Sequence, residues 1–180
     1  MNDADAKMGK SVEATREEFA AIRAGRANPA MFAKITADYY GTQTPLQQLA
    51  SFTSQDARTI LIQPFDIGAM GNIERAIRDS DLGVNPANDG KVLRCVFPEL
   101  TEERRKEYIK LAKAKAEDGR VSVRNVRRTA KQGLEKLEKD GEVGKDDVTG
   151  AEKRLDALTK THTDKIDELL KHKEAELLEV

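Results

Sequence analysis

The chain lacks tryptophan, contains a single cysteine, and has no proline after residue 98. The lone thiol, Cys95, excludes an internal disulfide and any metal site built from several cysteines. No segment approaches the roughly 20 apolar residues of a membrane-spanning helix, and the first residues lack the apolar stretch of a signal peptide. We therefore expect a soluble, cytoplasmic protein with no membrane partner.

Proline and aromatic residues are concentrated in the middle of the sequence. All five prolines and six of the eight aromatic residues fall between residues 29 and 98. Proline removes a backbone donor and disfavours helix at the residue before it, so the proline-free remainder favours long helices. Because 35% of the residues are charged and 4% are aromatic, these helices should have narrow apolar seams.

Three segments carry apolar residues at the three- and four-residue spacing of a helix face: 4–24, 102–139 and 145–178. A single amphipathic helix is marginal in water, so we expect the three to bury their seams against one another. Gly119 and Gly133 interrupt the second segment, and each costs about 1 kcal/mol relative to alanine. Close helix packing at these two positions would offset that cost.

Between the first two helices the pattern changes to four short β-like runs, "KITADYYG", "ASFTS", "RTILIQPF" and "KVLRCVF", and one helix, "GAMGNIERAIRDSDLG". Asn28 should cap a short helical turn that starts at Pro29. The predicted fold is α+β with two domains. A long three-helix bundle is formed by residues 1–28 and 101–180, and a small, mostly β, α/β domain of residues 29–100 is inserted into it.

Two short connections join the predicted domains. Both are short enough to flex, while two together make a stiffer joint than one. The predicted hinge residues are Ala27, Asn28, Pro29, Pro98 and Glu99.

Positive charge is gathered in the second helical segment. Residues 102–139 hold thirteen cations and seven acids, whereas residues 140–180 hold seven and twelve. The stretch "RVSVRNVRRTAK", residues 120–131, holds five cations and no acid. Four of these cations share one helix face, Arg120, Arg124, Arg127 and Lys131.

The paired donors of arginine suit phosphate, so this face predicts a nucleic-acid contact. No aromatic residue stands beside it for base stacking, which favours recognition of folded RNA through its backbone and shape. The alternative is a solvated face that the acidic last helix neutralises.

Catalytic chemistry has little support in the sequence. His162 lies on the apolar stripe of the last helix, where a packed seam residue is the simpler interpretation, and no nucleophile is matched to His172. There is no phosphate-binding glycine loop and no metal-ligand cluster. We predict a protein that is not an enzyme, with no catalytic residue, cofactor or metal.

Tyr39 and Tyr40 precede Gly41 and are interpreted as a strand end at a turn. One of the two rings must face outward, because successive side chains in a strand point to opposite faces. A contact role for that outward ring stays open.

The segments "RAGRANPAMF", "YYGTQTPLQQLA", "LTEERRKEY" and "VSVRNVRR", in this order and spacing, resemble the bacterial ribosome recycling factor family. The resemblance covers essentially the whole chain. It implies an L-shaped, two-domain monomer that hydrolyses nothing itself. It also implies binding to the large ribosomal subunit and its 23S rRNA. With elongation factor G and GTP, such a factor dissociates post-termination ribosomes into subunits and frees them from mRNA.

Carried onto this sequence, the resemblance implies RNA contacts at Arg104, Arg105, Arg124, Arg127 and Arg128, with Arg23, Arg26 and Asn125 as further candidates. Arg127 is placed first among them. The alternative function is a helical protein–protein adaptor that does not bind RNA and whose arginines only keep it in solution.

Overall fold

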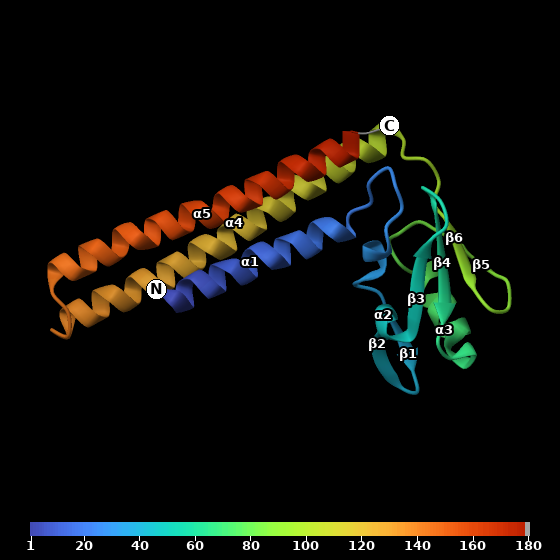
Figure 1. The fold of residues 1–180 in the computed structure, drawn as a ribbon, viewed down its shortest axis with the longest axis horizontal. Helices are drawn as coiled ribbons and strands as arrows, with labels where there is room; N and C mark the ends of the chain where they lie inside the picture. Colours follow the sequence, from blue (N-terminus) through green and yellow to red (C-terminus); the bar gives the residue numbers. More distant parts are fainter. Residues whose placement is uncertain (179–180) are drawn as a thin grey trace. The chain divides into compact units, whose positions relative to one another are not determined.

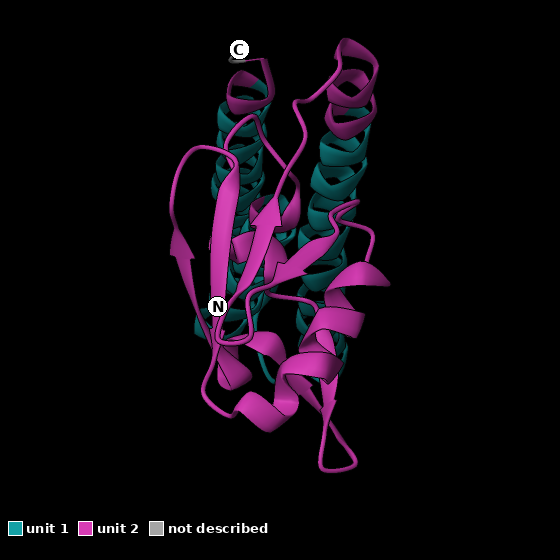
Figure 2. Ribbon diagram, turned by 90° about the vertical axis from the view of Figure 1, so that its right-hand side faces the viewer, with its two compact units in different colours: residues 1–19, 110–174 teal, residues 20–109, 175–180 magenta. Residues whose placement is uncertain are grey.

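The computed structural model describes residues 1–178, which form two compact units. The helical unit comprises Met1–Phe19 and Lys110–Glu174. The mixed unit comprises Ala20–Ile109 and, from Ala175, the last described residues of α5 (Figure 2). The predicted α+β, two-domain class is confirmed. Within the described residues, no helix is both long and apolar enough to cross a membrane.

Three helices pack side by side in the helical unit (Figure 1), and their bounds are α1 Asn2–Ala21, α4 Glu102–Lys139 and α5 Lys145–Leu178. The predicted bounds of the second and third helices are confirmed. The prediction for the first is wrong at its end, because α1 stops at Ala21 and not at residue 24. The next two residues, Ile22 and Arg23, leave the helix and are both buried.

The seam of the helical unit is narrow, as the composition predicts. On α1 the buried residues are Ala4, Met8, Val12, Thr15 and Phe19, and on α4 they are Ala112, Ala116, Gly119 and Val123. Towards their connecting turn, α4 and α5 extend past the start of α1 (Figure 1). Leu134 is there only half-buried and Leu137 is exposed, because a third helix no longer covers them.

At Gly119 of α4, side chains of both α1 and α5 approach the helix closely. A Cβ atom at this position would lie 2.2 Å from Thr15 Oγ1 and 3.1 Å from Ile166 Cδ1. At Gly133 a Cβ atom would meet nothing within 4 Å. The packing explanation is therefore right for Gly119 and wrong for Gly133.

In the mixed unit, the described residues form six strands: β1 Thr36–Tyr39, β2 Thr42–Pro45, β3 Ala50–Ser54, β4 Thr59–Pro64, β5 Pro86–Asn88 and β6 Leu93–Val96. The first two form a hairpin, and the other four form an antiparallel sheet in the order β3-β4-β6-β5. The short helices are η1 Pro29–Phe32, α2 Leu46–Leu49, η2 Ile67–Ala69 and α3 Met70–Arg78.

The core of the mixed unit is built around the sheet and α3. Its fully buried large side chains include Phe32, Phe97, Ile60, Ile62, Ile73, Ile77 and Leu93. The predicted helix and four strands are confirmed. The strands β2 and β5 were not predicted, because "TQTP" is wholly polar before its proline and "PAN" begins with Pro86. Both lie at the edge of their sheet, where proline is tolerated and no apolar alternation is required.

The predicted hinge residues are anchored to the mixed unit. Asn28 caps η1, its Oδ1 accepting from the Ala30 amide at 2.8 Å, as predicted. The Ala27 amide donates to the Ala57 carbonyl at 2.7 Å, the Pro98 carbonyl accepts from the Arg23 guanidinium, and Glu99 lies 3.5 Å from Arg58. The hinge and the domain bounds at residues 28 and 101 stay predictions.

Candidate nucleic-acid interface

The cationic face of α4 is met by carboxylates of α5. Arg127 Nε donates to Asp156 Oδ1 at 2.7 Å, and Lys131 Nζ lies 3.5 Å from Glu152 Oε1. Their acidic partners are 29 and 21 residues away in sequence, across the turn between the two helices. The neutralisation by the last helix, which the sequence left open as an alternative, therefore occurs in part.

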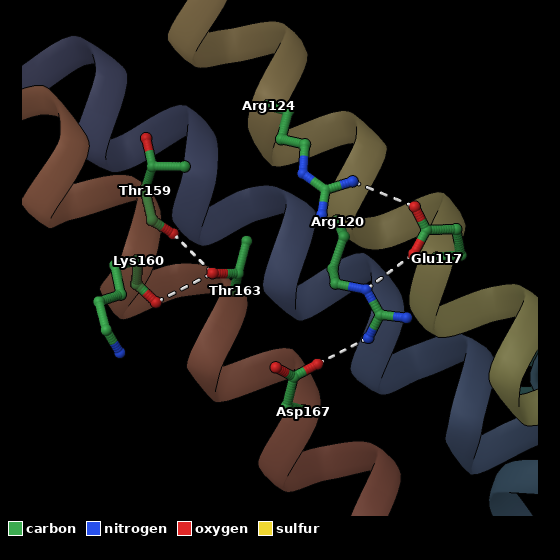
Figure 3. A network of polar contacts seen from close by, with 7 residues as sticks. All are labelled: Glu117, Arg120, Arg124, Thr159, Lys160, Thr163 and Asp167. Atoms are coloured by element: carbon green, nitrogen blue, oxygen red, sulfur yellow. Dashed lines mark hydrogen bonds and ion pairs between the residues drawn. The ribbon is translucent and has the colours of Figure 1, made fainter.

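Arg120 is the most enclosed cation of this face (Figure 3). Its guanidinium contacts Glu117 at 2.9 Å and Asp167 at 2.6 Å, and only 20% of its side chain is exposed. Although burial favours the neutral form, the hydrogen bonds from Glu117 and Asp167 raise the pKa of Arg120. Arg120 thus holds α4 and α5 together and offers little surface to a ligand.

The neighbouring cations are more open. Arg124 donates to the other oxygen of Glu117 at 3.1 Å (Figure 3), and more than half of its side chain is exposed. Arg127 keeps 40% of its side chain exposed beside Asp156. Arg128 and Asn125 are exposed, and within residues 1–178 Arg128 forms no ion pair. These four residues form one accessible cluster, which we call the α4 cluster.

The other predicted RNA contacts lie in the mixed unit. Arg104 is exposed and donates to Glu107 at 3.0 Å. Arg105 is half-buried, and its Nε has no hydrogen-bond partner among the described residues. Arg26 is exposed. These side chains carry positive charge, but only Arg104 and Arg26 present it openly.

Arg23 does not fit the prediction of an RNA contact. The residue is 8% exposed, its guanidinium donates to the Pro98 carbonyl, and its Cζ lies 5.4 Å from the centre of the Phe97 ring. Burial lowers the pKa of Arg23, which the coupling to Tyr108 partly opposes. A guanidinium enclosed in this way ties the end of α1 to the residues before α4. We therefore interpret Arg23 as a structural residue.

His162 and Cys95, two side chains of types that can take part in catalysis, are both buried. His162 is buried on α5, with Nε2 2.7 Å from Asp5 Oδ1 on α1, which confirms a seam residue. Burial raises the pKa of the Cys95 thiol to about 12, so the reactive thiolate is absent at neutral pH. Among the described residues there is no group of three or more possible metal ligands.

An exposed aromatic tip stands out on the mixed unit, and we define it as Tyr40, Phe65 and Ile67. Tyr40 is 85% exposed at the β1–β2 turn, in the left-handed region with φ 49°, and the other two side chains are also exposed. The hydroxyls of Tyr39 and Tyr40 donate to Asp66 Oδ2 at 3.2 and 3.4 Å. The sequence predicts one outward ring of the tyrosine pair, and the structure identifies it as Tyr40.

Sequence comparison places the chain among known proteins. The sequence model of the family described as Ribosome recycling factor matches residues 15–178. The ribosome-recycling factor of Nocardioides sp. (strain ATCC BAA-499 / JS614) is 79% identical over 180 residues, which cover 100% of this chain and 97% of that protein. The ribosome-recycling factor of Cutibacterium acnes (strain DSM 16379 / KPA171202) is 62% identical over 180 residues, which cover 100% of this chain and 98% of that protein.

Solved structures of ribosome recycling factors are also similar to this chain. A solution structure of the ribosome recycling factor is similar with a TM-score of 0.77 and 39% identity, over 99% of this chain and 95% of that chain. A second structure has a TM-score of 0.67 and 42% identity, over 99% of this chain and 96% of that chain. It is described as models for the T. thermophilus ribosome recycling factor and the E. coli elongation factor G bound to the E. coli post-termination complex. The chain therefore belongs to the ribosome recycling factor family.

Proposed function

We propose that the chain binds the large ribosomal subunit after termination and, with elongation factor G and GTP, separates the ribosome into subunits and frees it from mRNA. Family membership and the solved complex of a relative with elongation factor G support this proposal. In this proposal the chain is a cytoplasmic monomer that hydrolyses nothing, because the nucleotide is consumed by its partner. The adaptor alternative is not favoured, because a family of this name acts on ribosomes.

The observation that carries the RNA contact is the α4 cluster, in which Arg124 and Arg128 are exposed one turn apart and Arg127 and Asn125 flank them on either side. Guanidinium groups form short, charge-assisted, paired hydrogen bonds with phosphate oxygens. They sit on a stiff helix, so several can meet phosphates of a folded RNA together. We propose 23S rRNA as the ligand, with Arg104, Arg105 and Arg26 as secondary contacts.

We also propose how force reaches the anchored helices. Residues 1–28 and 101–180 form the RNA-anchored domain, residues 29–100 receive the push of elongation factor G, and the connections around Asn28 and Pro98 act as the hinge. Such a lever needs a rigid receiving domain, and the continuous buried core of the mixed unit supplies it.

The proposal is tested by following subunit separation of post-termination ribosomes by light scattering. We expect separation only when this chain, elongation factor G and GTP are all present. If the chain bound large subunits but the ribosomes did not separate, recycling would be contradicted. The proposed RNA contact would still stand.

We propose that the aromatic tip is the contact for elongation factor G. Exposed tyrosine and phenylalanine are common anchors of protein interfaces, whereas the Asp66 carboxylate among them would repel phosphate. Burial of the ring, and to a smaller extent the Asp66 carboxylate, raise the pKa of Tyr39. The tip therefore fits a protein surface that is apolar and carries a donor or a cation.

The variant Phe65→Ser/Ile67→Ser should slow subunit separation about 5-fold or more, since losing an interface anchor costs over 1 kcal/mol. Binding to large subunits alone should not change. Val96→Ser, at another exposed apolar residue of the mixed unit, is the matched control. Equal rates for the two variants would rule out the tip as the contact.

A further inference from the structure

Ion pairs connect α4 and α5, and we give the name ion-pair ladder to four of them within residues 1–178: Lys113–Glu174, Arg120–Asp167, Arg127–Asp156 and Lys131–Glu152, at 3.4, 2.6, 2.7 and 3.5 Å. One of its steps, Arg127–Asp156, lies within the α4 cluster. Another, Arg120–Asp167, borders it through Glu117, which also holds Arg124 (Figure 3). Two of the arginines proposed to bind RNA, Arg124 and Arg127, are thus already paired with carboxylates.

A phosphate that binds Arg127 has to compete with Asp156. Both partners are exposed, Asp156 to 57%, and exposed pairs of this kind are weak, so displacement is possible. The displaced carboxylate stays on α5 beside the site and repels the incoming phosphate. Each such contact therefore gains less affinity than a free arginine would.

We propose that Asp156 limits the affinity of the α4 cluster for RNA. This inference rests on the proposed function, because it concerns the same cluster. A ligand that offers one phosphate at a time gains little affinity from each exchange, whereas a folded RNA that presents several phosphates together adds up these small gains. The carboxylates thus favour binding of structured RNA over binding of other polyanions. They also speed dissociation from the RNA, which suits a factor that acts repeatedly.

The structure offers a matched control for this role. Asp164 is on the same helix and is nearly as exposed as Asp156, but it pairs with Lys160 of α5 at 2.5 Å and with no residue of α4 among residues 1–178. Asp156→Asn and Asp164→Asn therefore remove the same charge and one exposed ion pair each. Only the first releases an arginine of the α4 cluster.

The experiment measures binding of fluorescently labelled full chain to large ribosomal subunits between about 50 and 200 mM salt. We expect Asp156→Asn to tighten binding about 3- to 10-fold at the low-salt end, and Asp164→Asn to stay within about 2-fold of the wild type. The plot of log K against log salt should become steeper by up to about 1 for Asp156→Asn, since the free Arg127 then exchanges small ions for a phosphate.

Two further variants separate the possible failures. Most of the gain from Asp156→Asn should vanish in the Arg127→Ala background, because the released group is then absent. Unchanged or weaker binding by Asp156→Asn, or equal tightening by Asp164→Asn, would overturn the inference while Arg127→Ala still weakens binding. If Arg127→Ala has no effect either, the proposed RNA contact itself fails. Thermal melting of each variant checks that the helices stay paired.

Discussion

Gly119→Val should lower the free energy of unfolding by about 3 kcal/mol or more, the upper range for overpacking a tight core. The first added atom would already lie 2.2 Å from Thr15 Oγ1, well inside contact distance. Thr15 has little room to move, because it is buried and its hydroxyl donates to the Ser11 carbonyl at 2.9 Å. The side chain of Ile166 blocks the other direction at 3.1 Å.

Gly133→Val is the matched control, since it makes the same change on the same helix with nothing within 4 Å. Valine and glycine differ by only a few tenths of a kcal/mol in helix propensity, in favour of valine, so this variant should be as stable as the wild type or slightly more stable. Urea unfolding followed by circular dichroism gives both values. Equal midpoints for the two variants would show that the three helices do not meet closely at Gly119.

The long helices could be predicted from the sequence because their signal is redundant. Across residues 102–139 and 145–178 the apolar spacing repeats over many turns with no proline to break it. The strands β2 and β5 carry no such signal, since a short polar edge strand is defined by its partner and not by its own pattern. The early end of α1 has a related cause, because the contacts of Arg23 with Phe97 and Pro98 are tertiary and leave no local pattern in the sequence.

The sequence predicts which residues form the candidate site. It does not predict which carboxylates pair with them or how deeply they are buried. The absence of acid in "RVSVRNVRRTAK" suggested unpaired cations, yet Asp156 and Asp167 reach Arg127 and Arg120 from 29 and 47 residues away. The excess of acid in residues 140–180 was the available signal, but it gives no register between the helices. Arg23 shows the same limit, because a resemblance transfers the residue and not its burial.

The α4 cluster should dominate the affinity for large ribosomal subunits. Replacing Arg124, Arg127 and Arg128 together with alanine should weaken binding by about 10-fold or more for each phosphate that the variant can no longer bind, the effect of a hydrogen bond to a charged group. The slope of log K against log salt should fall by about 1 for each of these phosphates. Subunit separation at limiting protein should fall with it, because fewer ribosomes then carry the factor.

A change in net charge alone would also weaken binding to RNA, so the control has to remove the same charge. Lys153, Lys165 and Lys171 are exposed on α5, and within residues 1–178 none of them forms an ion pair. Their triple alanine variant removes three charges without touching the α4 cluster. It should keep most of the wild-type affinity and salt slope, because long-range attraction is screened beyond about 10 Å at 0.1 M salt. If affinity fell equally in both triple variants, the arginines would act only as diffuse charge, and binding of their guanidinium groups to RNA phosphates would be ruled out.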